Sequence, residues 1–318
     1  MANPDAGNMD HSAPAVFGRP EAAEFATESL SCSPARADRH PDTELMTSRA
    51  FAPAAALACG LLLASCSGGA DDDASGAPPG SGEYLAGRTA TVDLVAEPKA
   101  VVVLVPGGAW AQVWDPPGFR PLAEAFVDAD LAVVQIAYST AETDAFYPRP
   151  VDDIACAAAF AAEQAPGVPV VLVGHSAGAH LVALTGLAPG RDDPECPYSP
   201  HAADAVVGLA GPYDVSRAGS IAENLFGVAE RRDPELWLQG NPSTWVGERL
   251  ELPFLLMHGE ADSQVPVWQT EHLAEALEVA GHPVTVEVLP GREHNDLYQP
   301  DVVADLIIGW IDRSLGST

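Results

Sequence analysis

The chain has 318 residues, of which 47% are hydrophobic and 19% are charged, so it carries enough apolar material for a sizeable core and is not a disordered chain. It contains 15 Lys and Arg against 45 Asp and Glu, which gives a formal net charge of −30. Because nucleic acids are bound by cationic surfaces, this balance argues against a nucleic-acid partner.

The N-terminal part has the pattern of a leader that precedes the folded domain. Residues 1–45 are polar and Pro-rich without sustained periodicity, so we interpret them as an upstream extension or a mis-assigned start, with translation beginning at Met46. Residues 46–65 combine a short basic start with an apolar run that is too short for an ordinary membrane-spanning helix. This pattern is typical of a secretory signal.

The end of that leader predicts a lipid anchor. The sequence LASC at residues 63–66 resembles a bacterial lipobox, whose cysteine is acylated after cleavage. Residues 66–83 are rich in Gly, Ser, Asp and Pro, and they are predicted to form a flexible tether. We therefore expect an extracytoplasmic lipoprotein of the cell envelope that contacts the membrane surface through Cys66. The alternative is that Cys66 is an ordinary cysteine of a simple signal peptide.

Two further cysteines, Cys156 and Cys196, lie in the predicted folded domain over residues 84–318. Export would put them in an oxidising compartment, so we predict a disulfide between them. The alternative is a pair of buried free thiols. We expect no metal site, because metal binding needs more ligands at closer spacing.

Within residues 84–318, short continuous apolar runs alternate with segments of helical spacing. Strands are expected at residues 101–105, 131–137, 169–173, 204–210, 253–257 and 284–289. Helices are expected at residues 119–129, 152–164, 177–187, 267–280 and 301–315. Continuous apolar strands between helices indicate an α/β fold, a doubly wound and mostly parallel sheet that is buried on both faces. Residues 215–250 break the alternation, and we predict a small helical cap insertion there.

The sequence GHSAG at residues 174–178 follows a predicted strand and opens a predicted helix. A G-x-S-x-G turn in this setting exposes its serine between strand and helix, and the flanking glycines remove side chains that would block the turn. Ser176 is therefore the predicted nucleophile.

A serine nucleophile needs a base and a carboxylate that orients the base. Doubly wound sheets place their sites beyond the carboxyl ends of the strands, and two suitable residues lie there. Asp262 follows the strand at 253–257 as the predicted orienting acid, and His294 follows the strand at 284–289 as the predicted general base. Asp214, which ends an earlier strand, and Glu260 are the alternative carboxylates.

The other histidines are given structural roles. His175 lies inside the serine turn, His180 on the helix after it, and His258 at a strand end, where each is expected to pack. His272 and His282 are expected at the surface of a helix and its end.

An acyl-transfer site also needs donors for the developing oxyanion. The sequence PGGAW at residues 106–110 directly follows a predicted strand, and its glycines would let backbone N–H groups approach the substrate. The predicted donors are the N–H groups of Ala177 and of Gly108 or Ala109; the alternative is a plain Gly-Gly turn. Trp110 and Tyr213 are candidates for the pocket wall, with core packing as the alternative.

Together these motifs resemble α/β-hydrolases of the esterase/lipase type whose oxyanion loop reads HGG-x-W. The resemblance covers residues 84–318 and rests on residues 106–110, 174–178, His180, 211–214, Asp262 and His294. The most similar branch holds kynurenine-formamidase-like and acetyl- or feruloyl-esterase-like enzymes. Pro106 stands where that family usually has His, so the anchoring of the loop is expected to differ.

The function expected from these residues is hydrolysis of carboxylic esters, with small acyl or aryl esters as substrates and an acyl-enzyme on Ser176. The resemblance implies no metal and no organic cofactor. Two alternatives stay open. An amidase or peptidase would use the same triad, because the fold does not separate the two reactions. A surface lipoprotein that only binds a ligand is the second alternative.

Overall fold

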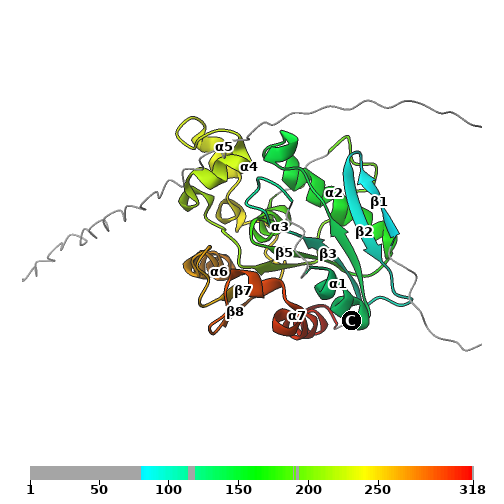
Figure 1. Ribbon diagram of the computed structural model, residues 1–318. Coiled ribbons are helices and arrows are strands. Elements are labelled where there is room, and N and C mark those ends of the chain that lie inside the picture. The colour runs from blue at the N-terminus through cyan, green and yellow to red at the C-terminus, as the bar shows by residue number, and fades with distance from the viewer. Residues whose placement is uncertain (1–79, 114–118, 189, 191–192, 317–318) are drawn as a thin grey trace, which may run out of the picture. The chain divides into compact units, whose positions relative to one another are not determined.

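The computed structural model describes residues 80–113, 119–188, 190 and 193–316 (Figure 1). The predicted leader, Cys66 and most of the predicted tether lie outside the described residues and stay predictions. In the described part of the chain, no helix is long and apolar enough to cross a membrane.

Within the described residues, eight strands form one sheet in the order β1-β2-β4-β3-β5-β6-β7-β8. The strands are β1 (Gly80–Leu85), β2 (Arg88–Asp93), β3 (Ala100–Val105), β4 (Leu131–Ile136), β5 (Val170–His175), β6 (Ala205–Leu209), β7 (Phe254–Gly259) and β8 (Val284–Leu289). All pairs between β4 and β8 in this order are parallel, whereas β1 with β2 and β2 with β4 are antiparallel. The predicted doubly wound, mostly parallel sheet is confirmed.

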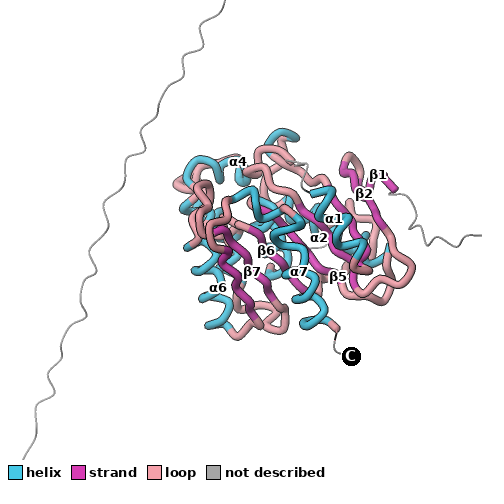
Figure 2. The backbone as a smooth tube through the Cα atoms, turned by 60° about the horizontal axis from the view of Figure 1, so that its bottom comes forward, coloured by secondary structure: helices cyan, strands magenta, loops and turns pink. Residues whose placement is uncertain are grey.

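Helices cover both faces of this sheet, and Figure 2 shows α1 and α7 together over one of them. The long helices are α1 (Phe119–Asp128), α2 (Arg149–Gln164), α3 (Ala177–Leu187), α6 (Trp268–Ala280) and α7 (Pro300–Leu315). Residues of β3 alternate between the two cores: Val103 packs with α2 and α3, and Val102 and Leu104 pack with α1 and α7. Because both of its faces are buried, the strand is a continuous apolar run.

β1 and β2 form an antiparallel hairpin that the sequence analysis did not predict. β1 begins at Gly80, before the expected domain boundary at residue 84, and its first four residues are exposed. These exposed residues are small or polar, as in a linker, so the sequence did not indicate a strand. Its strand conformation comes from pairing with β2, in which Gly80 lies opposite Val92. Only the last residues of β1, Tyr84 and Leu85, enter the core.

Residues 215–250 fold into short helical turns. These are η2 (Val215–Arg217), η3 (Gly219–Ala222), α4 (Glu223–Phe226), α5 (Pro234–Gln239) and η4 (Pro242–Trp245). Helices this short are unstable alone, so packing must hold them. Phe226 and Trp237 stack with ring centroids 4.5 Å apart, and Phe226 also contacts Tyr147 just before α2. This aromatic cluster attaches the insertion to the main body.

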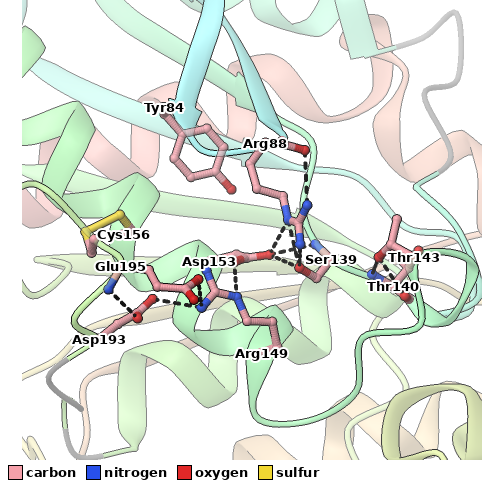
Figure 3. A network of polar contacts seen from close by, with 12 residues as sticks. Tyr84, Arg88, Ser139, Thr140, Thr143, Arg149, Asp153, Cys156, Asp193 and Glu195 are labelled. Carbon is pink, nitrogen blue, oxygen red and sulfur yellow. Dashed lines mark hydrogen bonds and ion pairs between the residues drawn. A yellow bond between two sulfur atoms is a disulfide. The ribbon is translucent and has the colours of Figure 1, made fainter.

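A disulfide joins Cys156 of α2 to Cys196 in the loop after α3, with Cα atoms 5.6 Å apart, as predicted. Beside it, Arg149 pairs with Asp193 and Glu195 of the same loop (Figure 3). The loop is thus tied to the N-terminal end of α2 by ion pairs and to its middle by a covalent bond.

Arg149 also pairs with Asp153, whose side chain is fully buried, and Arg88 of β2 reaches the same carboxylate (Figure 3). The backbone N–H of Ser139 donates to it at 2.7 Å. A buried carboxylate is tolerated only when it is paired and hydrogen-bonded, and both conditions hold here. The cluster therefore connects β2, α2 and the segment that follows β4.

Candidate active site

Ser176 lies at the turn between β5 and α3 with φ 55° and ψ −122°. Residues other than glycine rarely adopt this backbone conformation. The flanking glycines explain how the turn closes. A Cβ on Gly174 would lie 2.4 Å from the carbonyl oxygen of Gly178, and a Cβ on Gly178 would lie 2.3 Å from that of Val105. Glycine is thus required at both positions, and the predicted elbow has the expected form.

His294 and Asp262 come from neighbouring loops and meet directly. Nδ1 of His294 donates to Oδ2 of Asp262 at 2.7 Å, and both side chains are almost completely buried. Gly259 at the end of β7 permits this approach, since a Cβ there would lie 2.2 Å from the carbonyl oxygen of Arg292. With its proton on Nδ1, His294 has Nε2 free to accept a proton.

Asp262 remains ionised in this setting. Burial by itself raises its pKa, but hydrogen bonds from His258 and His294 and from the N–H of Val265 outweigh that effect and hold the pKa below its ordinary range. Oδ1 accepts from the N–H groups of Gln264 and Val265, each at 2.8 Å. The alternative carboxylates have other partners: Asp214 caps η2, and Glu260 accepts from the N–H of Gly291.

The loop after β3 packs directly on the serine. A Cβ on Gly107 would lie 2.9 Å from Cβ of Ser176, so only glycine lets the two backbones come this close. Gly108, Ala109 and Trp110 all have positive φ, a conformation that residues other than glycine rarely adopt. Ala177 is the first residue of α3, where an N–H has no acceptor within the helix. Of the predicted oxyanion donors, Gly108 and Ala109 line the same cavity as Ser176, and Ala177 directly follows the serine.

Pro106 leaves this loop without a histidine anchor, and other groups hold it. The Tyr138 hydroxyl donates to the Pro106 carbonyl at 2.9 Å in a buried setting, and burial raises the pKa of Tyr138, so the hydroxyl stays a donor. Asn224 of α4 donates to the carbonyl of Ala109 at 3.2 Å. The N–H of Ala141 donates to the Trp110 carbonyl at 3.1 Å.

A cavity of about 390 Å³ opens at this point. It is lined by Gly108, Ala109, Ala111, Gln112, His175, Ser176, Gln264, His294 and Asn295. Gln112, Gln264 and Asn295 are exposed, and each has a carboxamide that both donates and accepts hydrogen bonds. Sequence reasoning missed these three residues, because isolated amides in loops carry no periodic or motif signal.

Trp110 and Tyr213, the candidates for the pocket wall, are both placed in the core and not along this cavity. Each is 2% exposed. Trp110 packs edge-on against His180 with centroids 5.2 Å apart, and the Tyr213 hydroxyl lies against Gly208 and Gly211. The alternative prediction, that Trp110 and Tyr213 pack in the core, is therefore confirmed.

His175 is buried as expected, but it also lies at the candidate site. It lines the cavity, and its Nε2 donates to the carbonyl of His294 at 3.0 Å. Burial and then the nearby His294 lower the pKa of His175 to about 3, so the ring is neutral. His180 is buried as expected, and its Nε2 donates to the carbonyl of Gly240 at 2.9 Å.

His272 is exposed as expected, but the surface position expected for His282 is wrong. His282 is 5% exposed, and its ring nitrogens lie 3.1 and 2.9 Å from the carbonyl oxygens of Leu252 and Val246. Its location after the end of α6 suggested solvent, whereas the ring fills the space between that end and the loop before β7.

Comparisons with known proteins agree with this architecture. The BD-FAE family model matches residues 93–277. Esterase LipQ of Mycobacterium tuberculosis is 31% identical over 235 residues, which cover 68% of this chain and 55% of that protein. Esterase LipC of the same organism is 32% identical over 227 residues, which cover 64% and 54%. The chain thus spans about half the length of the curated relatives it matches.

Solved structures show the same fold. A truncated carbohydrate esterase from gut microbiota has a TM-score of 0.64 and 18% identity, covering 77% of this chain and 99% of that one. A propionate-bound esterase from Thermogutta terrifontis has a TM-score of 0.59 and 22% identity, covering 76% and 94%. The family model covers more than half of the sequence, so the chain belongs to the BD-FAE family, and its mostly parallel sheet has the α/β-hydrolase fold of these structures.

Proposed function

We propose that this protein is a serine hydrolase of carboxylic esters, with Ser176 as nucleophile, His294 as general base and Asp262 as the orienting acid. The observation that carries the proposal is the 2.7 Å contact of His294 Nδ1 with Asp262 Oδ2, at a cavity that His294 shares with the elbow serine. Curated relatives named as esterases support the same reaction class.

In the proposed reaction, Ser176 Oγ attacks the ester carbonyl carbon while His294 Nε2 takes the hydroxyl proton. The carbonyl oxygen becomes an oxyanion that accepts from the N–H groups of Ala177 and of Gly108 or Ala109. His294 then protonates the leaving alcohol as the C–O bond breaks. Water, deprotonated by His294, then attacks the acyl carbon. The bond to Ser176 Oγ breaks, His294 returns the proton to Oγ, and the acid is released. Throughout, Asp262 stabilises the imidazolium that forms on His294.

The cavity favours short acyl groups and a neutral, polar alcohol part. At about 390 Å³ it has the size of a small ligand site. Apart from the histidines, its polar side chains are Ser176 and the carboxamides of Gln112, Gln264 and Asn295, which bind hydroxyl and carbonyl groups. The structural neighbours include esterases bound to propionate and butyrate, which fits acyl groups of this length.

The test is a rate comparison over p-nitrophenyl esters from acetate to palmitate, with the wild type beside Ser176→Ala. We expect the highest kcat/KM for acyl chains of about four carbons or fewer, and a fall in kcat of about 10⁶-fold in Ser176→Ala. Equal activity of the two proteins would refute the assignment of the nucleophile. Turnover of anilide but not ester substrates would instead indicate an amidase, in line with a kynurenine formamidase of Drosophila melanogaster that is 24% identical over 154 residues.

We further propose that the protein is exported and held at the membrane surface by acylation of Cys66. The support is the lipobox-like sequence at residues 63–66 and the predicted tether behind it. A disulfide between Cys156 and Cys196 fits an oxidising compartment, where such bonds persist.

A further inference from the structure

His258 is a buried polar side chain that the proposed reaction leaves without a role. It lies in β7, its side chain is fully buried, and its Nε2 is 3.2 Å from Oδ2 of Asp262. The same nitrogen is 2.9 Å from the carbonyl oxygen of Val265. Because a carbonyl only accepts, Nε2 carries the proton, and it donates to the carbonyl and the carboxylate together.

The other ring nitrogen of His258 also has a buried partner. Nδ1 of His258 lies 2.7 Å from the hydroxyl of Thr270 on α6, which is also fully buried. With the ring proton on Nε2, Nδ1 is an acceptor, so the Thr270 hydroxyl donates to it. Thr270 thereby aims the N–H of His258 at Asp262.

Oδ2 of Asp262 therefore receives two imidazole donors, one from His294 and one from His258. Oδ1 receives two backbone donors, from Gln264 and Val265. Four donors on one carboxylate fix its plane and direct Oδ2 at His294. They also divide its negative charge, so His258 limits how strongly the carboxylate stabilises the imidazolium of His294.

We propose that His258 is a positioning residue, which holds the Asp262 carboxylate toward His294 and sets the basicity of His294 by sharing the same oxygen. This inference rests on the proposed function and deepens it. The titratable groups that face the His258–Asp262 pair are His294 of η5 (His294–Tyr298), His175 of β5, and Glu293, which accepts from the hydroxyl of Ser263 in the Asp262 loop. All three stay unchanged in the variants below.

The experiment compares the pH profile of kcat/KM for His258→Phe, His258→Gln and Thr270→Val with that of the wild type. Phe keeps a ring but donates nothing, whereas the Gln amide can donate from the place of Nε2. Thr270→Val removes the hydroxyl that aims the N–H of His258 at Asp262 and keeps the His258 ring. We expect His258→Phe to lose about tenfold in kcat and to raise the pKa of the acidic limb by about half a unit or more, because Asp262 then gives its charge to His294 alone.

In His258→Gln the acidic limb returns to the wild-type position, and in Thr270→Val it shifts in the same direction as in His258→Phe but by less. Loss of stability in His258→Phe with an unchanged acidic limb would overturn the proposal, and so would an acidic limb that His258→Gln does not return to the wild-type position.

A spectroscopic measurement decides the question even if His258→Phe does not fold. In ¹⁵N-histidine-labelled wild type, His258 is expected as the neutral tautomer with its proton on Nε2, and this signal is expected to shift in Asp262→Asn. A proton on Nδ1, or no response to Asp262→Asn, would overturn the proposal. Absence of ester hydrolysis in the wild type would refute the proposed function, and these signals would still show whether His258 holds Asp262.

Discussion

Tyr138 replaces part of the anchoring that the loop after β3 lacks at Pro106. Its hydroxyl is the donor to the Pro106 carbonyl, and that carbonyl lies close against Gly178 of the elbow. Loss of the hydroxyl would free the loop without changing the serine, the histidine or the aspartate.

Tyr138→Phe tests this role. We expect kcat to fall roughly tenfold with KM nearly unchanged, because the loop contacts an oxyanion that develops only in the transition state. The free energy of unfolding should fall by about 1 kcal/mol for the lost hydrogen bond. Tyr84→Phe is the matched control, since it loses a similar bond to the carbonyl of Ala137 at 3.0 Å. A reduction of kcat of the same size in both variants would contradict a specific role for Tyr138.

His175 makes stability depend on pH. Its pKa is about 3 in the folded protein and about 6.5 in an unfolded chain. The unfolded state therefore binds the proton first, so stability is fully present above about pH 6.5 and falls as the pH drops from there toward 3. His180, whose pKa burial lowers to about 4, contributes in the same direction.

The measurement is the free energy of unfolding in urea between pH 3 and 7 for wild type and His175→Gln. Gln stays neutral over this range and can keep the bond to the His294 carbonyl. We expect the curve of the variant to fall less steeply than that of the wild type as the pH drops. Parallel curves would show that His175 takes up its proton equally in both states.

At the scale of elements, six strands and five helices could be predicted, because the burial of each segment is visible in its own pattern of apolar residues. β3, β5 and β7 are buried along their whole length, so each is an uninterrupted apolar run. The β1–β2 hairpin could not be predicted, because β1 is mostly exposed and becomes a strand through its pairing with β2. Edge strands of this kind lack the burial pattern that identifies central ones.

The disulfide belongs to this scale because it ties α2 to the loop after α3. It closes a loop of 40 residues, for which the loss of chain entropy predicts a stabilisation of about 4 kcal/mol, with measured values commonly 2–4 kcal/mol. Reduction, or the double change Cys156→Ser with Cys196→Ser, should lower the free energy of unfolding by that amount. Alkylation of both thiols in the native protein before any reduction would contradict the disulfide.

At the scale of the whole molecule, the site residues that sequence could identify are those fixed by a motif or by strand order. Ser176 lies in the elbow, and Asp262 and His294 follow consecutive strands of the sheet. The amides of the cavity rim and the partners of His258 depend on how loops from distant parts of the chain meet. Trp110 ends the loop after β3, yet its ring is buried in the core. The direction of its side chain follows from the positive φ of its backbone, which cannot be read from the sequence.

Membrane attachment is also a property of the whole protein. If Cys66 is acylated, the full-length protein expressed in a bacterial host should partition into the detergent phase of a Triton X-114 separation, and Cys66→Ala should stay in the aqueous phase. Cys59→Ala serves as the control, because it removes another leader cysteine outside the lipobox-like sequence. Equal partitioning of wild type and Cys66→Ala would reject the anchor.

The most direct test of the proposed catalytic serine is covalent labelling by a serine-directed phosphonate, followed by intact mass measurement and peptide mapping. The predicted result is one adduct per chain, located on Ser176, absent in Ser176→Ala and much slower to form in His294→Ala. An adduct on another residue, or no adduct in the wild type, would contradict the assignment of Ser176 as a nucleophile activated by His294.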